Sequence, residues 1–168
     1  MMIARRWKRL FLASVLASLA IFPIAQSAAG TPVAVRIEGS ARTLFDGTVT
    51  VLDCAITDTD GKEHVFSNAA VCALAAAAEE AQFTTDFQDF GFGLFLKRVA
   101  GDDTPSDFSQ SWNFWANDDP ASVGLDAYTV ATGDRLLVAF APYPGMPLRV
   151  TVPASVTAGV PASFLVEK

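Results

Sequence analysis

Two-residue alternation of apolar and polar positions marks the first part of the chain. Val33, Val35 and Ile37 alternate with polar or small residues, which predicts a half-buried strand. Residues 45–48, reading FDGT, predict a hairpin turn because glycine tolerates positive φ, and the apolar residues 49–52 then predict a second strand. Residues 58–61, reading DTDG, predict another turn rather than a calcium loop, whose remaining acidic ligands are missing.

A helical spacing of apolar residues follows in an alanine-rich run. Val71, Leu74, Ala75 and Ala78 recur at this spacing, and Ser67 or Asn68 is a candidate N-cap. Alternation returns afterwards, and it predicts strands over residues 83–87, 91–99, 111–117, 127–130 and 136–140, with a polar loop at 101–107 and a turn at 132–134. The order predicts an α+β fold, a β-grasp-like mixed sheet packed on a single helix, over residues 31–143.

The last residues have a different pattern. Residues 147–168 place valines and Phe164 around prolines and an Ala-Gly turn. We interpret them as the opening strands of an immunoglobulin-like domain that is incomplete at Lys168, because such a sandwich takes about 100 residues. The alternative is a C-terminal tail that adds an edge strand to the preceding domain.

The first residues have the plan of a secretory signal. Arg5, Arg6, Lys8 and Arg9 precede an apolar run over residues 10–24, and small residues follow. We expect residues 1–29 to be a signal peptide, cleaved after Ser27 or Ala29, with the mature chain secreted or in the cell envelope and without a membrane span. An uncleaved anchor is the alternative, although about 15 apolar residues are short of the roughly 20 that a span needs.

Composition and charge limit the classes of partner that we expect. The 168 residues are 51% hydrophobic, which suits one folded domain with appendages. All 18 acidic residues follow Gly30, where only eight basic residues face them, so the mature chain carries a net charge of −10. Phosphate backbones and anionic lipids would be repelled, which excludes nucleic acid as an expected partner.

Cys54 and Cys72 predict one disulfide in an exported protein. Their spacing does not suit a redox CxxC motif or a zinc ribbon, and the single histidine, His64, would be a lone third ligand. The sequence therefore predicts no metal site. It also shows no nucleophile with a base and an orienting group, so we expect no enzymatic activity.

Several segments together resemble the transcobalamin-like C-terminal domain family of bacterial secreted proteins and cobalamin carriers. They read VRIEG, TLFDG and VTV, then DGKEHVFSNAAVCALAAAAEEAQF, SWNFWAND and GLDAYTVATGDRLLVAF. The resemblance implies a β-grasp fold without enzymatic activity. In the carriers this domain covers one face of the corrin ring, and a separate α-barrel, absent here, holds the other. Residues 117–120, reading NDDP, depart from the usual Asn-Gly of the family.

Candidate binding residues come from alternation in the SWNFWAN segment. Trp112 and Phe114 face the core, so Trp115 should lie on the opposite face with Asn113 and Asn117, exposed unless a loop or the C-terminal tail covers it. An exposed indole beside amides suits ligand binding. Phe92 and Phe95, assigned to opposite faces of one strand, are further candidates.

Two functions follow from these residues. The first is a non-enzymatic secreted or cell-surface binding module that recognises a protein or glycan partner. The alternative is capture of a corrinoid or another flat apolar small molecule. We expect no cofactor, although the resemblance allows cobalamin.

Overall fold

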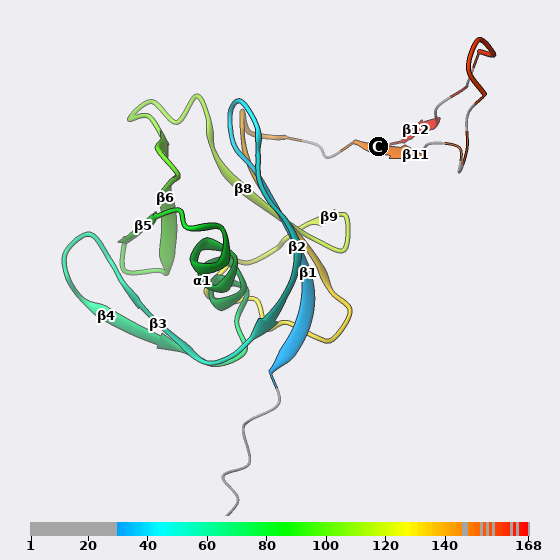
Figure 1. The fold of residues 1–168 in the computed structure, drawn as a ribbon. Helices are drawn as coiled ribbons and strands as arrows, with labels where there is room; N and C mark the ends of the chain where they lie inside the picture. Colours follow the sequence, from blue (N-terminus) through cyan, green and yellow to red (C-terminus); the bar gives the residue numbers. More distant parts are fainter. Residues whose placement is uncertain are drawn as a thin grey trace, which may run out of the picture.

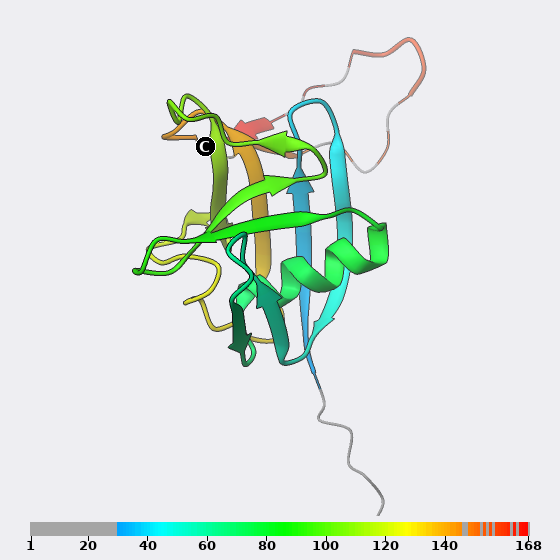
Figure 2. The ribbon, with the colours of Figure 1, turned by 90° about the vertical axis from the view of Figure 1, so that its left-hand side faces the viewer.

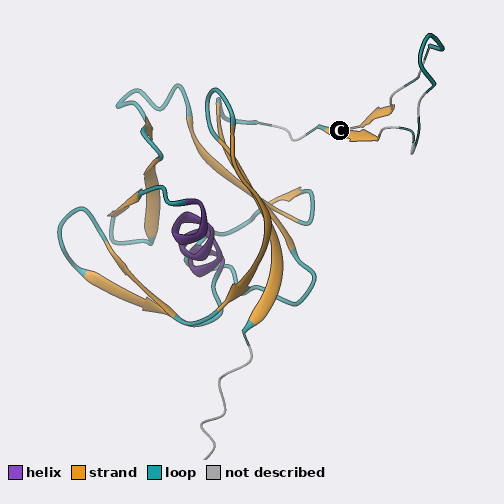
Figure 3. Ribbon diagram, viewed as in Figure 1, coloured by secondary structure: helices purple, strands orange, loops and turns teal. Residues whose placement is uncertain are grey.

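The computed structural model describes residues 30–145, and residues 148–167 except 152, 154, 156, 162 and 164. The predicted signal segment, residues 1–29, and its cleavage sites lie outside the described residues. The described chain is a mixed α+β structure with one α-helix and several small sheets (Figure 1, Figure 3). The elements in chain order are β1 Thr31–Glu38, β2 Thr43–Val51, β3 Cys54–Thr57, β4 Glu63–Phe66, α1 Ala70–Ala81, β5 Thr85–Asp89, β6 Leu94–Val99, β7 Asp102–Asp103, β8 Ser111–Ala116, β9 Asp119–Pro120, β10 Arg135–Ala141, β11 Arg149–Thr151 and β12 Leu165–Glu167.

A five-stranded mixed sheet is the largest layer, with strand order β2-β1-β10-β8-β9. The central strands β1 and β10 run parallel, and the other neighbours are antiparallel. Val33, Val35 and Ile37 of β1 are buried and their neighbours are not, as the alternation predicts. These three side chains provide the centre of the core under the helix.

The helix α1 lies between this sheet and two smaller groups of strands. These are the hairpin β3-β4 and the three-stranded sheet β5-β6-β7, on the far side of the helix (Figure 1, Figure 2). Small alanine side chains let strands approach the helix closely, and Ala70, Ala73 and Ala77 are completely buried. The predicted disulfide is confirmed: Cys54 at the start of β3 is bonded to Cys72 in the first turns of α1, with 5.5 Å between their Cα atoms.

The predicted turn at residues 45–48 is wrong. These residues lie inside β2, where Gly47 is opposite Val35, and the chain turns at residues 39–42 instead. The ring of Phe45 lies over Gly47, since a Cβ added to Gly47 would be 3.0 Å from the Phe45 Cζ atom. The glycine therefore makes room for an aromatic ring within a strand and does not make a turn.

The predicted helix is confirmed, but its predicted cap is wrong. Ala69 is the N-cap residue and makes no side-chain cap. Asn68 adopts a left-handed φ of 51° and donates its side-chain amide to the carbonyl of Val130. The backbone amides of Ala70 and Val71 donate to the carbonyls of Tyr128 and Leu125. A loop distant in the sequence therefore supplies hydrogen-bond acceptors for the first amides of the helix.

That loop explains a second correction. Residues 127–130 form a turn with a single bridge between Thr129 and Ala69, and not the predicted strand. The carbonyl of Tyr128 accepts the amide of Ala70, and that of Val130 accepts the side-chain amide of Asn68. The strand β10 pairs with β8 and β1.

The strands β11 and β12 near the C-terminus pair with each other. In Figure 1 this hairpin lies apart from the five-stranded sheet, so the described residues do not form the edge strand that was the alternative for this segment. Within the described residues, no helix has the length and apolar character needed to cross a bilayer.

Candidate functional site

Trp115 lies on the predicted face of β8 but is not exposed. Trp112, Phe114 and Ala116 pack with the core under the helix, and Trp115 is outside that core cluster. Nevertheless only 4% of Trp115 is exposed. Gly145 lies against the edge of the indole, since a Cβ added there would be 3.4 Å from its Cζ2 and Cη2 atoms. The prediction of an exposed indole is therefore wrong, and the contact with Gly145 is compatible with the alternative, a cover from a loop or the C-terminal tail.

The amides predicted beside Trp115 hold strands together. Asn113 Nδ2 donates to the carbonyls of Ser111 and Ala141, at 2.9 and 3.0 Å. Asn117 Nδ2 donates to Asp134 Oδ1 at 3.0 Å, and its Oδ1 accepts the amide of Arg135. The indole Nε1 of Trp115 is buried and has no partner within the described residues. Asn113 and Asn117 therefore use their side-chain amides to connect backbone segments, and the buried indole of Trp115 is not accessible to a ligand.

The turn after β8 contains the first two residues of the segment 117–120, NDDP, which differs from the Asn-Gly of the family that the sequence resembles. Asn117 and Asp118 both have positive φ, 56° and 74°, and they connect β8 to β9. A two-residue hairpin turn of this kind is the one that favours Asn-Gly. Asp118 therefore adopts a conformation that glycine favours in such turns.

Phe92 and Phe95 belong to an exposed group of four phenylalanines, which we call the aromatic cluster. The distance between ring centroids is 5.9 Å for Phe90 and Phe92, 5.8 Å for Phe90 and Phe95, and 5.9 Å for Phe95 and Phe108. Phe92 is 87% exposed. Phe92 lies in the turn before β6, so its assignment to the same strand as Phe95 is wrong, and the turn brings both residues into one cluster.

Two carboxylates hold the turn that presents Phe92. Asp89 Oδ1 accepts the amide of Gly91 at 2.7 Å, and Asp126 Oδ2 accepts the amide of Leu94 at 2.9 Å. Gly93 has a φ of 139°, and a Cβ there would be 2.8 Å from Asp126 Oδ2. Only glycine allows this approach without strain, so the sequence FGFG builds a turn that projects phenyl rings into solvent.

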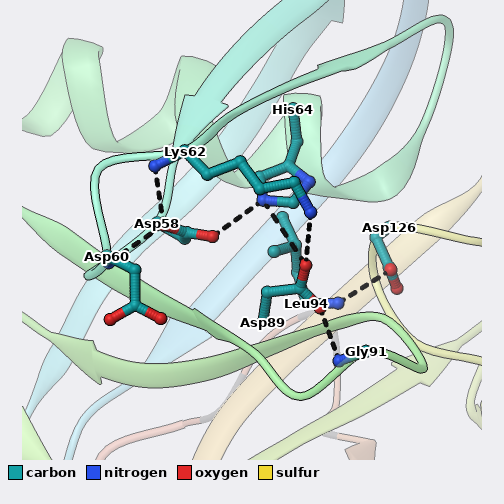
Figure 4. A network of polar contacts seen from close by, with 8 residues as sticks. All are labelled: Asp58, Asp60, Lys62, His64, Asp89, Gly91, Leu94 and Asp126. Atoms are coloured by element: carbon teal, nitrogen blue, oxygen red, sulfur yellow. Dashed lines mark hydrogen bonds and ion pairs between the residues drawn. The ribbon is translucent and has the colours of Figure 1, made fainter.

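A polar network lies beside this turn and joins three elements (Figure 4). Asp58, which follows β3, accepts the amides of Asp60 and Lys62 on Oδ1, both at 2.9 Å. Its Oδ2 lies 2.9 Å from Nε2 of His64 in β4. Asp89, the last residue of β5, accepts from Lys62 Nζ on Oδ2 at 2.8 Å.

Hydrogen bonds in the network stabilise the charged forms of its members. The hydrogen bond from His64, followed by the amide of Lys62, lowers the pKa of the Asp58 carboxyl. The hydrogen bond from Lys62, followed by the amide of Gly91, lowers the pKa of Asp89, and the same carboxylate raises the pKa of Lys62. Both carboxylates are therefore charged at neutral pH.

The network brings together side chains that can bind a metal ion. One ligand atom from each of Asp58, His64 and Asp89 lies within 4.8 Å of the others. Sequence spacing did not predict this set, because it related His64 only to the cysteines, which are bonded to each other. The available signal was Asp58 and His64 on either side of one hairpin turn, but Asp89 joins them only in the folded chain.

No family model and no curated protein sequence matches the chain. Solved structures similar to it include haptocorrin in complex with Cbi, at 15% identity and a TM-score of 0.48, with 70% of this chain and 27% of that chain covered. The chain thus spans about a quarter of the haptocorrin chain. A structure from Ruminococcus gnavus ATCC 29149, described as a "putative metal binding protein", has 15% identity and a TM-score of 0.41, with 67% of this chain and 97% of that chain covered. Neither similarity assigns a family or a ligand to this chain.

Proposed function

We propose that this protein is a non-enzymatic binding module of the cell surface or extracellular space, and that it recognises a protein partner through the aromatic cluster. The observation that carries the proposal is the exposure of Phe92, 87%, at the tip of a turn that two carboxylates hold in place. Exposed phenyl rings that contact one another are a typical anchor for a protein interface, where a few large side chains supply most of the binding energy.

The chemistry of the aromatic cluster favours a protein over the other two partner classes. Phenyl rings have no hydrogen-bonding groups, whereas a glycan needs them, and the amides of Asn113 and Asn117 are already engaged. A flat corrin ring needs a flat surface. Phe90 and Phe92 are nearly parallel, at 18°, but the ring of Phe95 is tilted by 54° against Phe90 and by 70° against Phe108. The four rings together therefore form an uneven surface that suits protruding apolar side chains.

Three further features support a role in binding at the cell surface or in the extracellular space. The Cys54–Cys72 disulfide is compatible with an oxidising compartment. The predicted charge of −10 after Gly30 favours a partner whose interface has a basic or neutral rim. The mixed sheet on a single helix is the arrangement expected for the β-grasp fold of the transcobalamin-like family, and an immunoglobulin-like domain that begins near residue 147 would place the aromatic cluster in a multidomain surface protein.

The test compares Phe92→Ser with the wild-type protein. A surface protein retrieved by photo-cross-linking through the turn at residues 90–93 is purified and titrated against both. Because Phe92 would be an anchor, we expect the substitution to weaken binding by at least about tenfold, the equivalent of ~1.4 kcal/mol. Phe92→Ser should leave the melting temperature unchanged, since the ring is almost fully exposed.

Val65→Ser is the matched control. Val65 is 72% exposed on β4 and lies outside the aromatic cluster, so its substitution should not change the affinity. Equal affinities of wild type and Phe92→Ser would overturn the proposal. Binding on a glycan array, or a spectral change on adding cobinamide that Phe92→Ser abolishes, would instead identify a glycan or a flat small molecule as the ligand of the aromatic cluster.

A further inference from the structure

The Asp58, His64 and Asp89 side chains converge from three separate elements. The distance from His64 Nε2 is 2.9 Å to Asp58 Oδ2 and 3.9 Å to Asp89 Oδ2. Two ligands of a tetrahedral zinc ion, each about 2.0–2.1 Å from the metal, lie roughly 3.3 Å apart. The two distances lie on either side of this separation, and the ligand atoms of Asp58 and Asp89 lie within 4.8 Å of each other. Side-chain rotations can therefore place all three atoms around one ion.

Backbone amides direct each carboxylate toward the centre of this set. Asp58 Oδ1 is held by the amides of Asp60 and Lys62, and Asp89 Oδ1 by the amide of Gly91, so both Oδ2 atoms face His64 (Figure 4). The Asp58 side chain is 1% exposed. A carboxylate buried and oriented in this way resembles a metal ligand with its outer hydrogen bonds already made.

The ammonium group of Lys62 already lies beside one of these carboxylates. Lys62 Nζ lies 2.8 Å from Asp89 Oδ2, and 64% of the lysine side chain is exposed. The two carboxylates carry two negative charges against the single charge of Lys62, so the arrangement favours a divalent cation in place of the ammonium group. Because the lysine is exposed, its ammonium can move into solvent without a loss of packing.

We infer that Asp58 Oδ2, His64 Nε2 and Asp89 Oδ2 form a binding site for a divalent transition-metal ion of the zinc type, from which the ammonium of Lys62 is displaced. An imidazole nitrogen with two carboxylate oxygens is a donor set for Zn²⁺ and not for Ca²⁺ or Mg²⁺, which prefer oxygen alone. His64 then carries its proton on Nδ1 and offers the Nε2 lone pair to the ion, and water completes the coordination. The cysteines do not compete, because they form the disulfide.

The experiment titrates the full mature chain with ZnCl₂ by calorimetry, after dialysis against a chelator. We expect one equivalent of zinc to bind. Asp89→Asn and His64→Ala should each weaken binding by at least about tenfold. Lys62→Met should strengthen it, because the competing ammonium is removed, and Asp60→Asn is the matched control, an acid of the same turn whose carboxylate points away from the set (Figure 4).

A loss of zinc binding in Asp89→Asn or His64→Ala could result from misfolding. A higher zinc affinity of Lys62→Met could not, so this variant distinguishes the two explanations. Co²⁺ in place of zinc should give visible absorption bands that are lost in His64→Ala. Absence of zinc binding to the wild-type protein, equal affinities of wild type and His64→Ala, or no gain in Lys62→Met would each overturn the inference. Equally strong binding of Ca²⁺ would overturn the assignment to a transition metal.

Discussion

At the scale of single residues, Asp58 is the clearest case of a charge that the fold buries and stabilises. Its carboxylate accepts two backbone amides and the hydrogen bond of His64, and these lower its pKa. The folded state therefore releases the Asp58 proton more readily than the unfolded state does. The resulting stabilisation is fully present above the ordinary aspartate pKa of about 3.9 and is lost as the pH falls through the lower pKa of the folded state.

This linkage predicts the behaviour of Asp58→Asn. The variant should melt at a lower temperature than the wild type at pH 7, and its melting temperature should fall less steeply as the pH drops below about 4. Thermal melts followed by circular dichroism in the presence of a chelator measure both effects. Asp60→Asn should keep the wild-type slope, and a parallel slope for Asp58→Asn would contradict the prediction.

At the scale of elements, the disulfide joins two parts that the chain order separates. It connects the start of β3 to α1 across a sequence separation of 18 residues. Closing a loop of this length removes about 3 kcal/mol of conformational freedom from the unfolded chain in the entropy model. The bond therefore stabilises the packing of the hairpin β3-β4 against the helix.

The prediction at this scale concerns the double variant Cys54→Ala with Cys72→Ala. Its free energy of unfolding should be lower than that of the wild type by about 3 kcal/mol, because the unfolded state regains the lost conformations. Urea titration measures the difference. Reduced wild-type protein should match the variant, whereas an unchanged urea midpoint in either would show that the bond contributes nothing.

Local patterns predicted most elements but not their ends. Alternation identified β1, β8 and β10, and helical spacing identified α1, because each of these buries one face against the core. Gly47 and Asn68 misled the prediction for a common reason. A glycine or an asparagine signals a turn or a cap locally, but here Phe45 and the carbonyl of Val130, which are supplied by tertiary packing, decide what each residue does.

At the scale of the whole molecule, the segment after β10 completes the outer face of the five-stranded sheet. Gly145 lies against the indole of Trp115, whereas the β11-β12 hairpin beyond it pairs with itself. Four residues of connecting chain, 142–145, therefore belong structurally to the domain that precedes them.

Two truncated chains test this boundary. A chain of residues 30–145 should have the melting temperature of a chain of residues 30–168, because it keeps the segment beside Trp115. A chain that ends at Ala141 should lose about 2 kcal/mol of stability, since a large apolar side chain becomes exposed. Denaturant titration of the three proteins measures this, and equal stability of the two truncated chains would show that the segment does not stabilise Trp115.

The sequence by itself determined the features that depend on neighbouring residues: the class of the fold, the strand and helix faces, the paired cysteines and the acidic charge after Gly30. Tertiary structure alone decided which candidate residues are accessible. It buried Trp115 beside Gly145 and gathered four phenylalanines around the turn before β6. It also brought Asp89 to the side of His64, 25 positions apart in the sequence. Exposure and convergence are set by contacts between segments far apart in the chain, and a local pattern carries no information about those contacts.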